Sequence, residues 1–99
     1  MDNQHKKISG YSDLSQAEID LMNEIKQKGE ELSQLANKVE QHLFEQTQAA
    51  YALEGEGEKE LEMARINAAN PHHWLYLAKS DLSVGIMKLV RSVAQPTSF

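Results

Sequence analysis

The spacing of apolar residues in the first half of the chain is the feature that most restricts its fold. Seven residues recur there at alternating intervals of three and four, which is typical of a helix that packs along one seam. The pattern predicts one long amphipathic helix over residues 15–53, with a glycine in the seam where another backbone or a ligand can approach closely. The seven residues are Met22, Ile25, Gly29, Leu32, Ala36, Val39 and Leu43.

The start of this helix has a signal of its own. Ser15 and Glu18 have the spacing of a capping box, in which each side chain bonds the backbone N–H of the other residue. Leu14 stands directly before the cap, where an apolar residue can pack onto the first turn. We therefore expect residues 1–14 to form a short N-terminal arm ahead of the helix.

The second half of the chain predicts a reversal and two further helices. The segment 54–58, Glu-Gly-Glu-Gly-Glu, indicates an acidic turn, read either as a solvated hairpin tip or as an acidic interaction loop. A helix is expected over 59–69, followed by a break in which Asn70 serves as the N-cap of the next helix. That last helix is predicted over 71–94, with a proline in its first turn and another shortly after its end.

The last predicted helix is apolar on most of its surface. A helix of this kind is buried on most sides, which one antiparallel neighbour cannot achieve. The helix over 15–53 would also be about 58 Å long, whereas a compact monomer of this length has a radius of gyration of about 13 Å. The sequence thus predicts an all-α fold, a single hairpin domain over 1–99 that assembles into a homo-oligomer. The expected seam of the last helix is Leu75, Ala78, Leu82, Gly85 and Leu89, and the neighbouring faces carry Trp74, Leu77, Val84, Met87 and Val90.

Composition excludes several classes of protein. The chain has no cysteine, which rules out a disulfide scaffold and a cysteine-based zinc module, and the net charge of −5 argues against nonspecific nucleic-acid binding. No apolar run approaches the roughly 18 residues of a membrane span, and the N-terminus lacks the apolar stretch of a signal peptide. The charge is divided unevenly: six lysines and fourteen acidic residues give −8 over 1–62, and four basic residues against one aspartate give +3 over 63–99. This division predicts that the two segments face each other, within one chain or between subunits.

No residue pattern of an enzyme, a metal site or a cofactor site is recognisable. His72 and His73 are adjacent, so on a helix they point about 100° apart and cannot hold one ion together. A small anionic ligand is the remaining hypothesis. Tyr11, on the N-terminal arm, can close over a planar base, and Lys26, beside the seam glycine, can bind a phosphate as a point charge.

Two stretches of the chain resemble a known family. The first, over 8–26, contains Ile-Ser-Gly-Tyr and Asn-Glu-Ile-Lys, and the second, over 74–96, contains Gly-x-Met-x-x-x-Arg-x-x-Ala-x-Pro. Together they cover roughly half of the chain and resemble the phage hairpin domain. This domain is shared by cyclic-nucleotide sponges that inhibit the bacterial CBASS defence and by an inhibitor of the Thoeris defence. The length is similar to that of the compact anti-CBASS type.

The resemblance implies a homohexamer of helical hairpins that acts in the cytoplasm of the infected bacterium. It would bind cyclic dinucleotides of the 3′,3′-cGAMP class intact, between subunits, and so deprive host effectors of their ligand. Tyr11 and Lys26 match the leading contacts of the family, and Gly10 and Ser12 are expected beside them. Ser12 stands where an arginine is common.

The resemblance also implies a weaker, second site. Some members of the family hold cyclic trinucleotides on the threefold axes of the hexamer. Lys28 and His72 correspond to the neighbourhood of that site, although both depart from the usual residues.

Two other functions are compatible with the same residues. A helical scaffolding or chaperone protein that pairs with a partner helix would also use an acidic segment and a heptad seam. Hydrolysis of cyclic nucleotides ranks third, because the sequence offers no general base and no metal cluster for it.

Overall fold

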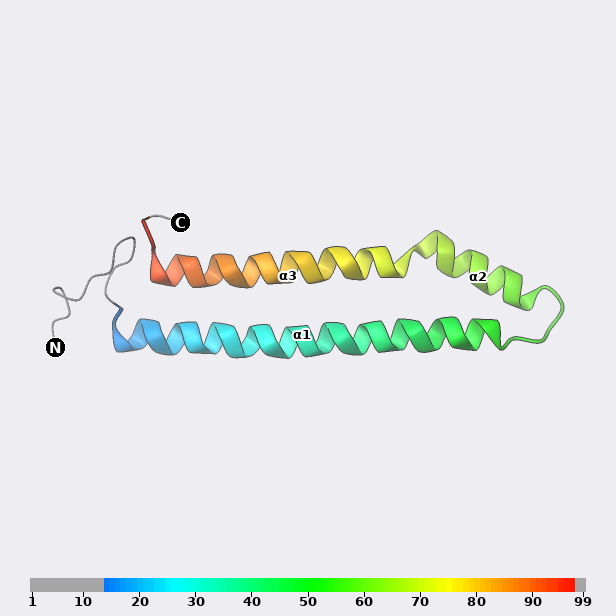
Figure 1. Cartoon of the computed structure of the whole chain (residues 1–99), viewed down its shortest axis with the longest axis horizontal. Coiled ribbons are helices and arrows are strands. Elements are labelled where there is room, and N and C mark those ends of the chain that lie inside the picture. The colour runs from blue at the N-terminus through cyan, green and yellow to red at the C-terminus, as the bar shows by residue number, and fades with distance from the viewer. Residues whose placement is uncertain (1–13, 98–99) are drawn as a thin grey trace. The chain divides into compact units, whose positions relative to one another are not determined.

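A computed structural model describes residues 14–97 of the chain, and these are all-helical (Figure 1). The three helices are α1 (Gln16–Tyr51), α2 (Glu58–Ala69) and α3 (Pro71–Ala94), of 36, 12 and 24 residues. No strand occurs over 14–97, which confirms the all-α class. None of the helices described there is long and apolar enough to cross a membrane.

The capping box forms at the start of α1. The backbone N–H of Ser15 donates to Glu18 Oε1 at 2.8 Å, and the backbone N–H of Glu18 donates to Ser15 Oγ at 3.1 Å. The bond from the Ser15 N–H favours the ionised carboxylate, so the pKa of Glu18 lies below 4.5; this backbone N–H is the largest cause and the Ser15 side chain the second. The helix expected from residue 15 accordingly begins one residue later, with Ser15 as its cap.

The lowered pKa of Glu18 predicts a loss of helix-start stability in acid. Because the folded-state pKa is depressed, the stabilisation is present above pH 4.5 and is lost as the pH falls through the folded pKa. Ser15→Ala should raise the pKa of Glu18 part of the way towards 4.5, as measured by NMR titration of its carboxyl carbon. Ser33→Ala, the same change at an exposed site further along α1, should leave that titration unchanged. An unchanged titration in Ser15→Ala would contradict the assignment.

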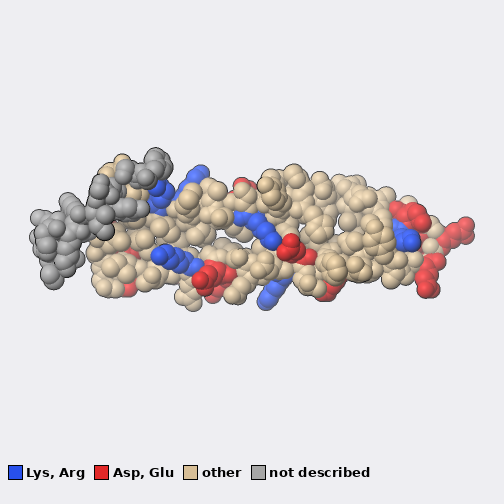
Figure 2. All heavy atoms as spheres, viewed as in Figure 1, with Lys and Arg blue, Asp and Glu red and all other residues tan. Residues whose placement is uncertain are grey.

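The connections between the helices use left-handed backbone. Residues 52–57 form the turn after α1, and Gly57, with φ 77°, precedes α2. Glutamates gather at this turn (Figure 2). Asn70 has φ 50° and ψ 52°, and its N–H donates to the carbonyl of Ile66, so it caps the end of α2. Asn70 also directly precedes Pro71, the first residue of α3, and its carbonyl accepts from the Trp74 N–H at 3.4 Å, so it occupies the predicted N-cap position of α3. Its backbone is left-handed because the same residue ends α2 in a short break.

The chain divides into two compact units. Unit 1 comprises Met1–Glu31 and Leu82–Phe99, of which the structure describes 14–31 and 82–97, and unit 2 comprises Leu32–Asp81. In unit 1 the first part of α1 runs antiparallel to the last part of α3 (Figure 1).

Gly29 is the point of close approach in unit 1. A Cβ atom on this residue would lie 3.3 Å from Ile86 Cγ2 and 3.4 Å from Ile86 Cγ1, so Ile86 fills the space that the glycine leaves. Around this contact the seam residues Met22 and Ile25 are half-buried, and Ala94 of α3 is buried. The seam predicted for this part of α1 is thus the face that packs on α3.

Replacing Gly29 with alanine tests this close approach. A glycine in a helix interior costs about 1 kcal/mol relative to alanine, but here the new methyl group would press on Ile86. Gly29→Ala should therefore stabilise the protein clearly less in the native background than in an Ile86→Ala background, where both nearest atoms are absent. Urea unfolding of the native chain, the two single variants and the double variant measures this difference. Equal effects of Gly29→Ala in both backgrounds would rule out the contact.

Unit 2 contains the larger buried core. The second part of α1 packs with α2 and the first part of α3, and the buried residues are Ala36, Leu43, Ala50 and Ile66. The predicted seam continues through Ala36 and Leu43, but Val39 is 41% exposed. A straight helix with 3.6 residues per turn drifts away from a strict heptad repeat, which accounts for this departure.

The seam predicted for α3 does not pack within the described residues over its second half. Leu82 and Leu89 are 38% and 52% exposed, and a Cβ atom on Gly85 would meet no atom within 4 Å. Ile86 and Val90 are half-buried instead. Together with Ala94 they recur every four residues, a spacing that the heptad template did not select, and they form the face of α3 that packs in unit 1.

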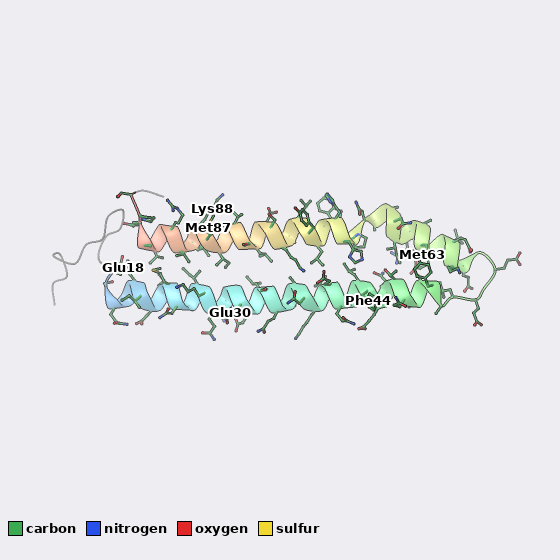
Figure 3. The ribbon with its side chains drawn as sticks, viewed as in Figure 1. Glu18, Glu30, Phe44, Met63, Met87 and Lys88 are labelled. Carbon is green, nitrogen blue, oxygen red and sulfur yellow. The ribbon has the colours of Figure 1, made fainter. Side chains whose placement is uncertain are left out.

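Many large apolar side chains of unit 2 are exposed. The buried residues of the described chain are few, and most of them are alanines. Phe44 (Figure 3) and the aromatic side chains of α3 project from the surface of this unit. The described residues 14–97 therefore leave these groups without cover. The most exposed are Phe44 (56%), Tyr51 (59%), Leu61 (75%), Trp74 (66%) and Tyr76 (70%).

Candidate functional site

Lys26 is the predicted site residue whose position the structure describes best. It lies in the second half of the α1 segment of unit 1, three residues before Gly29, and is therefore next to it on the helix surface. Its side chain is exposed and forms no ion pair within residues 14–97. An ammonium group in this state is available to a phosphate, because no carboxylate of the described chain competes for its charge.

Lys28 differs from Lys26 in this respect. Its Nζ lies 3.3 Å from Glu31 Oε2, in an ion pair between residues three apart on α1. Both side chains are more than half exposed. A ligand at Lys28 would have to compete with this carboxylate, so the geometry favours Lys26 as the anion-binding lysine.

The other predicted site residues are not brought together by the described structure. Gly10, Tyr11 and Ser12 lie outside the described residues. Lys28 belongs to unit 1 and His72 to unit 2, so their pairing at a second site stays a prediction.

The first turns of α3 carry exposed rings. His73 and Trp74 meet edge to face, with ring centroids 6.2 Å apart and planes at 62°. Trp74 is 66% exposed, so it does not belong to the core that residues 14–97 form. Over 14–97, no three potential ligands among His, Cys, Asp and Glu gather closely enough to hold a metal ion.

Two contacts, one in each unit, were not predicted from the sequence. Ile86, which fills the space at Gly29, lay outside the predicted seam, and its four-residue spacing to Val90 was the available signal. Lys79 Nζ donates to Glu40 Oε1 at 3.2 Å within unit 2. This pair joins the acidic and the basic segments, as their opposite charges predicted, although no spacing rule singles out these two residues.

Comparison with known proteins covers almost the whole chain. No protein-family model matches it. Anti-CBASS protein 2 of Pseudomonas phage JBD67 is 43% identical over 105 aligned positions, which span 97% of each chain. The similarity thus includes residues 37–70, where neither of the two motifs lies. Identity at this level along almost the full length of both proteins shows that the chain belongs to the phage anti-CBASS family.

Proposed function

We propose that the protein sequesters cyclic dinucleotides of the 3′,3′-cGAMP class without degrading them and so blocks activation of the host CBASS effectors. The observation that carries the proposal is Lys26, an exposed ammonium group without an ion pair in the described chain, beside the Gly29–Ile86 contact. The name of the relative supports inhibition of CBASS, and sequestration needs no catalytic group.

The binding site combines one cation and one ring from each of two subunits. Lys26 holds a phosphate, Tyr11 stacks on a base, and Gly10 and Ser12 line the arm beside it. Stacking of an aromatic side chain on a base is worth about 1–3 kcal/mol. A cyclic dinucleotide has two phosphates and two bases, so a site on a twofold axis between subunits gives each half of the ligand the same contacts.

A homohexamer in the cytoplasm of the infected cell is part of this proposal. The exposed apolar side chains of both units support self-association, since a monomer would leave them in water. Cyclic trinucleotides are a further class of ligand, for which Lys28 and His72 are the candidate contacts.

The direct test is to recover the ligand after binding. Purified protein is incubated with 3′,3′-cGAMP, separated from unbound nucleotide and denatured. The nucleotide released into the supernatant is then analysed by mass spectrometry. We expect intact cyclic dinucleotide in near-stoichiometric amount, and much less from Tyr11→Ala. Linear or hydrolysed product would instead identify a nuclease, and absence of nucleotide at micromolar protein would refute binding.

A scaffolding or chaperone protein is the second candidate. The observation that favours it is the exposure of Leu61, Trp74 and Tyr76 in unit 2, a surface that suits a partner helix. Native mass spectrometry without added nucleotide separates the two functions. A stable hexamer supports the sponge, whereas a monomer or dimer that binds no cyclic nucleotide supports the scaffold.

A further inference from the structure

One face of α3 points away from the packing in unit 1 and is open. Its centre is Gly85, where a Cβ atom would meet nothing within 4 Å. The residues three and four positions before and after Gly85 surround it on the helix surface. They are Asp81, Leu82, Lys88 and Leu89, all exposed, and with Gly85 they make up what we call the Gly85 face (Figure 3 labels Lys88).

We propose that the Gly85 face pairs with the same face of a second copy, with the two α3 helices antiparallel about a twofold axis at Gly85. This inference specifies the self-association contained in the proposed function. It involves no nucleotide, so it can be tested without one.

The residues of the face are complementary to themselves in this arrangement. On a helix with 3.6 residues per turn, Leu82 and Leu89 lie on one side of Gly85, and Asp81 and Lys88 lie on the other. A twofold axis perpendicular to two antiparallel helices brings like sides together and reverses the order along the helix. Leu82 of one copy then meets Leu89 of the other.

The charges of the face determine the direction of pairing. In the antiparallel arrangement Asp81 of one copy lies beside Lys88 of the other, and the pair occurs twice. Neither residue forms an ion pair within residues 14–97, so both charges are available. In a parallel pair about a twofold axis along the helices, the charged side of one copy would lie beside the leucine side of the other, so Asp81 and Lys88 would face apolar residues instead of each other.

The glycine at the centre fits the same contact. Without a side chain at the crossing point, two helix backbones can approach closely, and the leucines on one side can cover the gap. The heptad spacing of α3 predicts Leu82, Gly85 and Leu89 in a packing seam, but within residues 14–97 they do not pack. A second copy of α3 supplies the missing partner, and a face that pairs with itself is the kind of contact that cyclic and dihedral assemblies require.

Charge reversal tests the pairing. Native mass spectrometry of the nucleotide-free protein should show a smaller assembly for Asp81→Lys and for Lys88→Asp than for the native chain. The double variant should recover the native mass, because the ion pairs re-form with exchanged partners. Lys38→Asp, at an exposed lysine of α1, is the control and should keep the native mass. A monomeric native chain, unchanged single variants or a double variant that fails to recover would each overturn the proposal.

Cross-linking gives a second, independent test. The chain contains no cysteine, so a single introduced thiol reports on one position. Gly85→Cys has room for its side chain and should form a disulfide-linked dimer on mild oxidation. Ser80→Cys is the matched control, since in the antiparallel pair two copies of this residue are about 15 Å apart along the helix axis. No dimer from Gly85→Cys, or equal dimer from both variants, would overturn the proposal.

Titration with 3′,3′-cGAMP separates this inference from the proposed function. Cross-linking at Gly85→Cys in a protein that binds no cyclic dinucleotide would support the pairing and refute the sponge. A protein that binds the dinucleotide but forms no cross-link at Gly85→Cys would support the sponge and refute the pairing.

Discussion

Lys26→Ala is expected to weaken binding of 3′,3′-cGAMP by about 10- to 150-fold. Hydrogen bonds to charged groups contribute about 1.5–3 kcal/mol, and the Lys26 ammonium group has no ion pair in the described chain that would reduce its contribution. Isothermal titration calorimetry at moderate ionic strength measures the change directly. The dissociation constant of the Lys26→Ala variant should also depend less on salt concentration, since one ionic contact is lost.

Lys38→Ala is the matched control for this variant. It removes an exposed lysine of the same helix that also lacks an ion pair within residues 14–97. It should bind the dinucleotide as the native chain does, and both variants should keep the native helix content and assembly mass. Native-like binding by Lys26→Ala, or equal weakening by both variants, would show that Lys26 is not the phosphate contact.

Local signals in the sequence were sufficient for the start and the packing face of α1. Ser15 and Glu18 are three residues apart, so their hydrogen bonds depend on little beyond the first turn. No second face of α1 carries a continuous repeat of apolar residues; Leu21, Leu35 and Phe44 stand outside the seam and are exposed. The face was predictable because no other apolar repeat on this helix competes with it.

The face of α3 that packs within the chain could not be chosen in this way, because that helix offers several apolar faces. Two patterns fit this helix equally well. A heptad template selects Leu82, Gly85 and Leu89, and a four-residue repeat selects Ile86 and Val90. Which face packs within the chain depends on the shape of the partner, here the gap at Gly29 that receives Ile86. That contact joins residues far apart in the sequence, and periodicity carries no information about it.

The candidate site shows a similar division. The family resemblance indicated Lys26 and Lys28, but the sequence alone could not tell which of them has a free charge. The difference arises from the ion pair of Lys28 with Glu31, one of several that the acidic residues of α1 allow. A side-chain choice of this kind depends on three-dimensional geometry and not on spacing.

Leu43→Ala should produce the largest loss of stability among single truncations in unit 2. Leu43 is 8% exposed and is, with Ile66, one of the two large side chains of the buried core. Truncation of a buried leucine removes apolar burial and leaves a cavity, and we expect a cost of about 2–4 kcal/mol in the free energy of unfolding. Urea unfolding at several protein concentrations measures it and separates unfolding from any dissociation of subunits.

Leu35→Ala provides the comparison, because it makes the same chemical change on the same helix and in the same unit. Leu35 is 55% exposed in the single chain, so its truncation removes little burial there and should cost well under half as much. A cost for Leu43→Ala no larger than that for Leu35→Ala would contradict the assigned core. If instead both costs are large and the effect of Leu35→Ala grows with protein concentration, another copy covers Leu35, since only association makes stability depend on concentration.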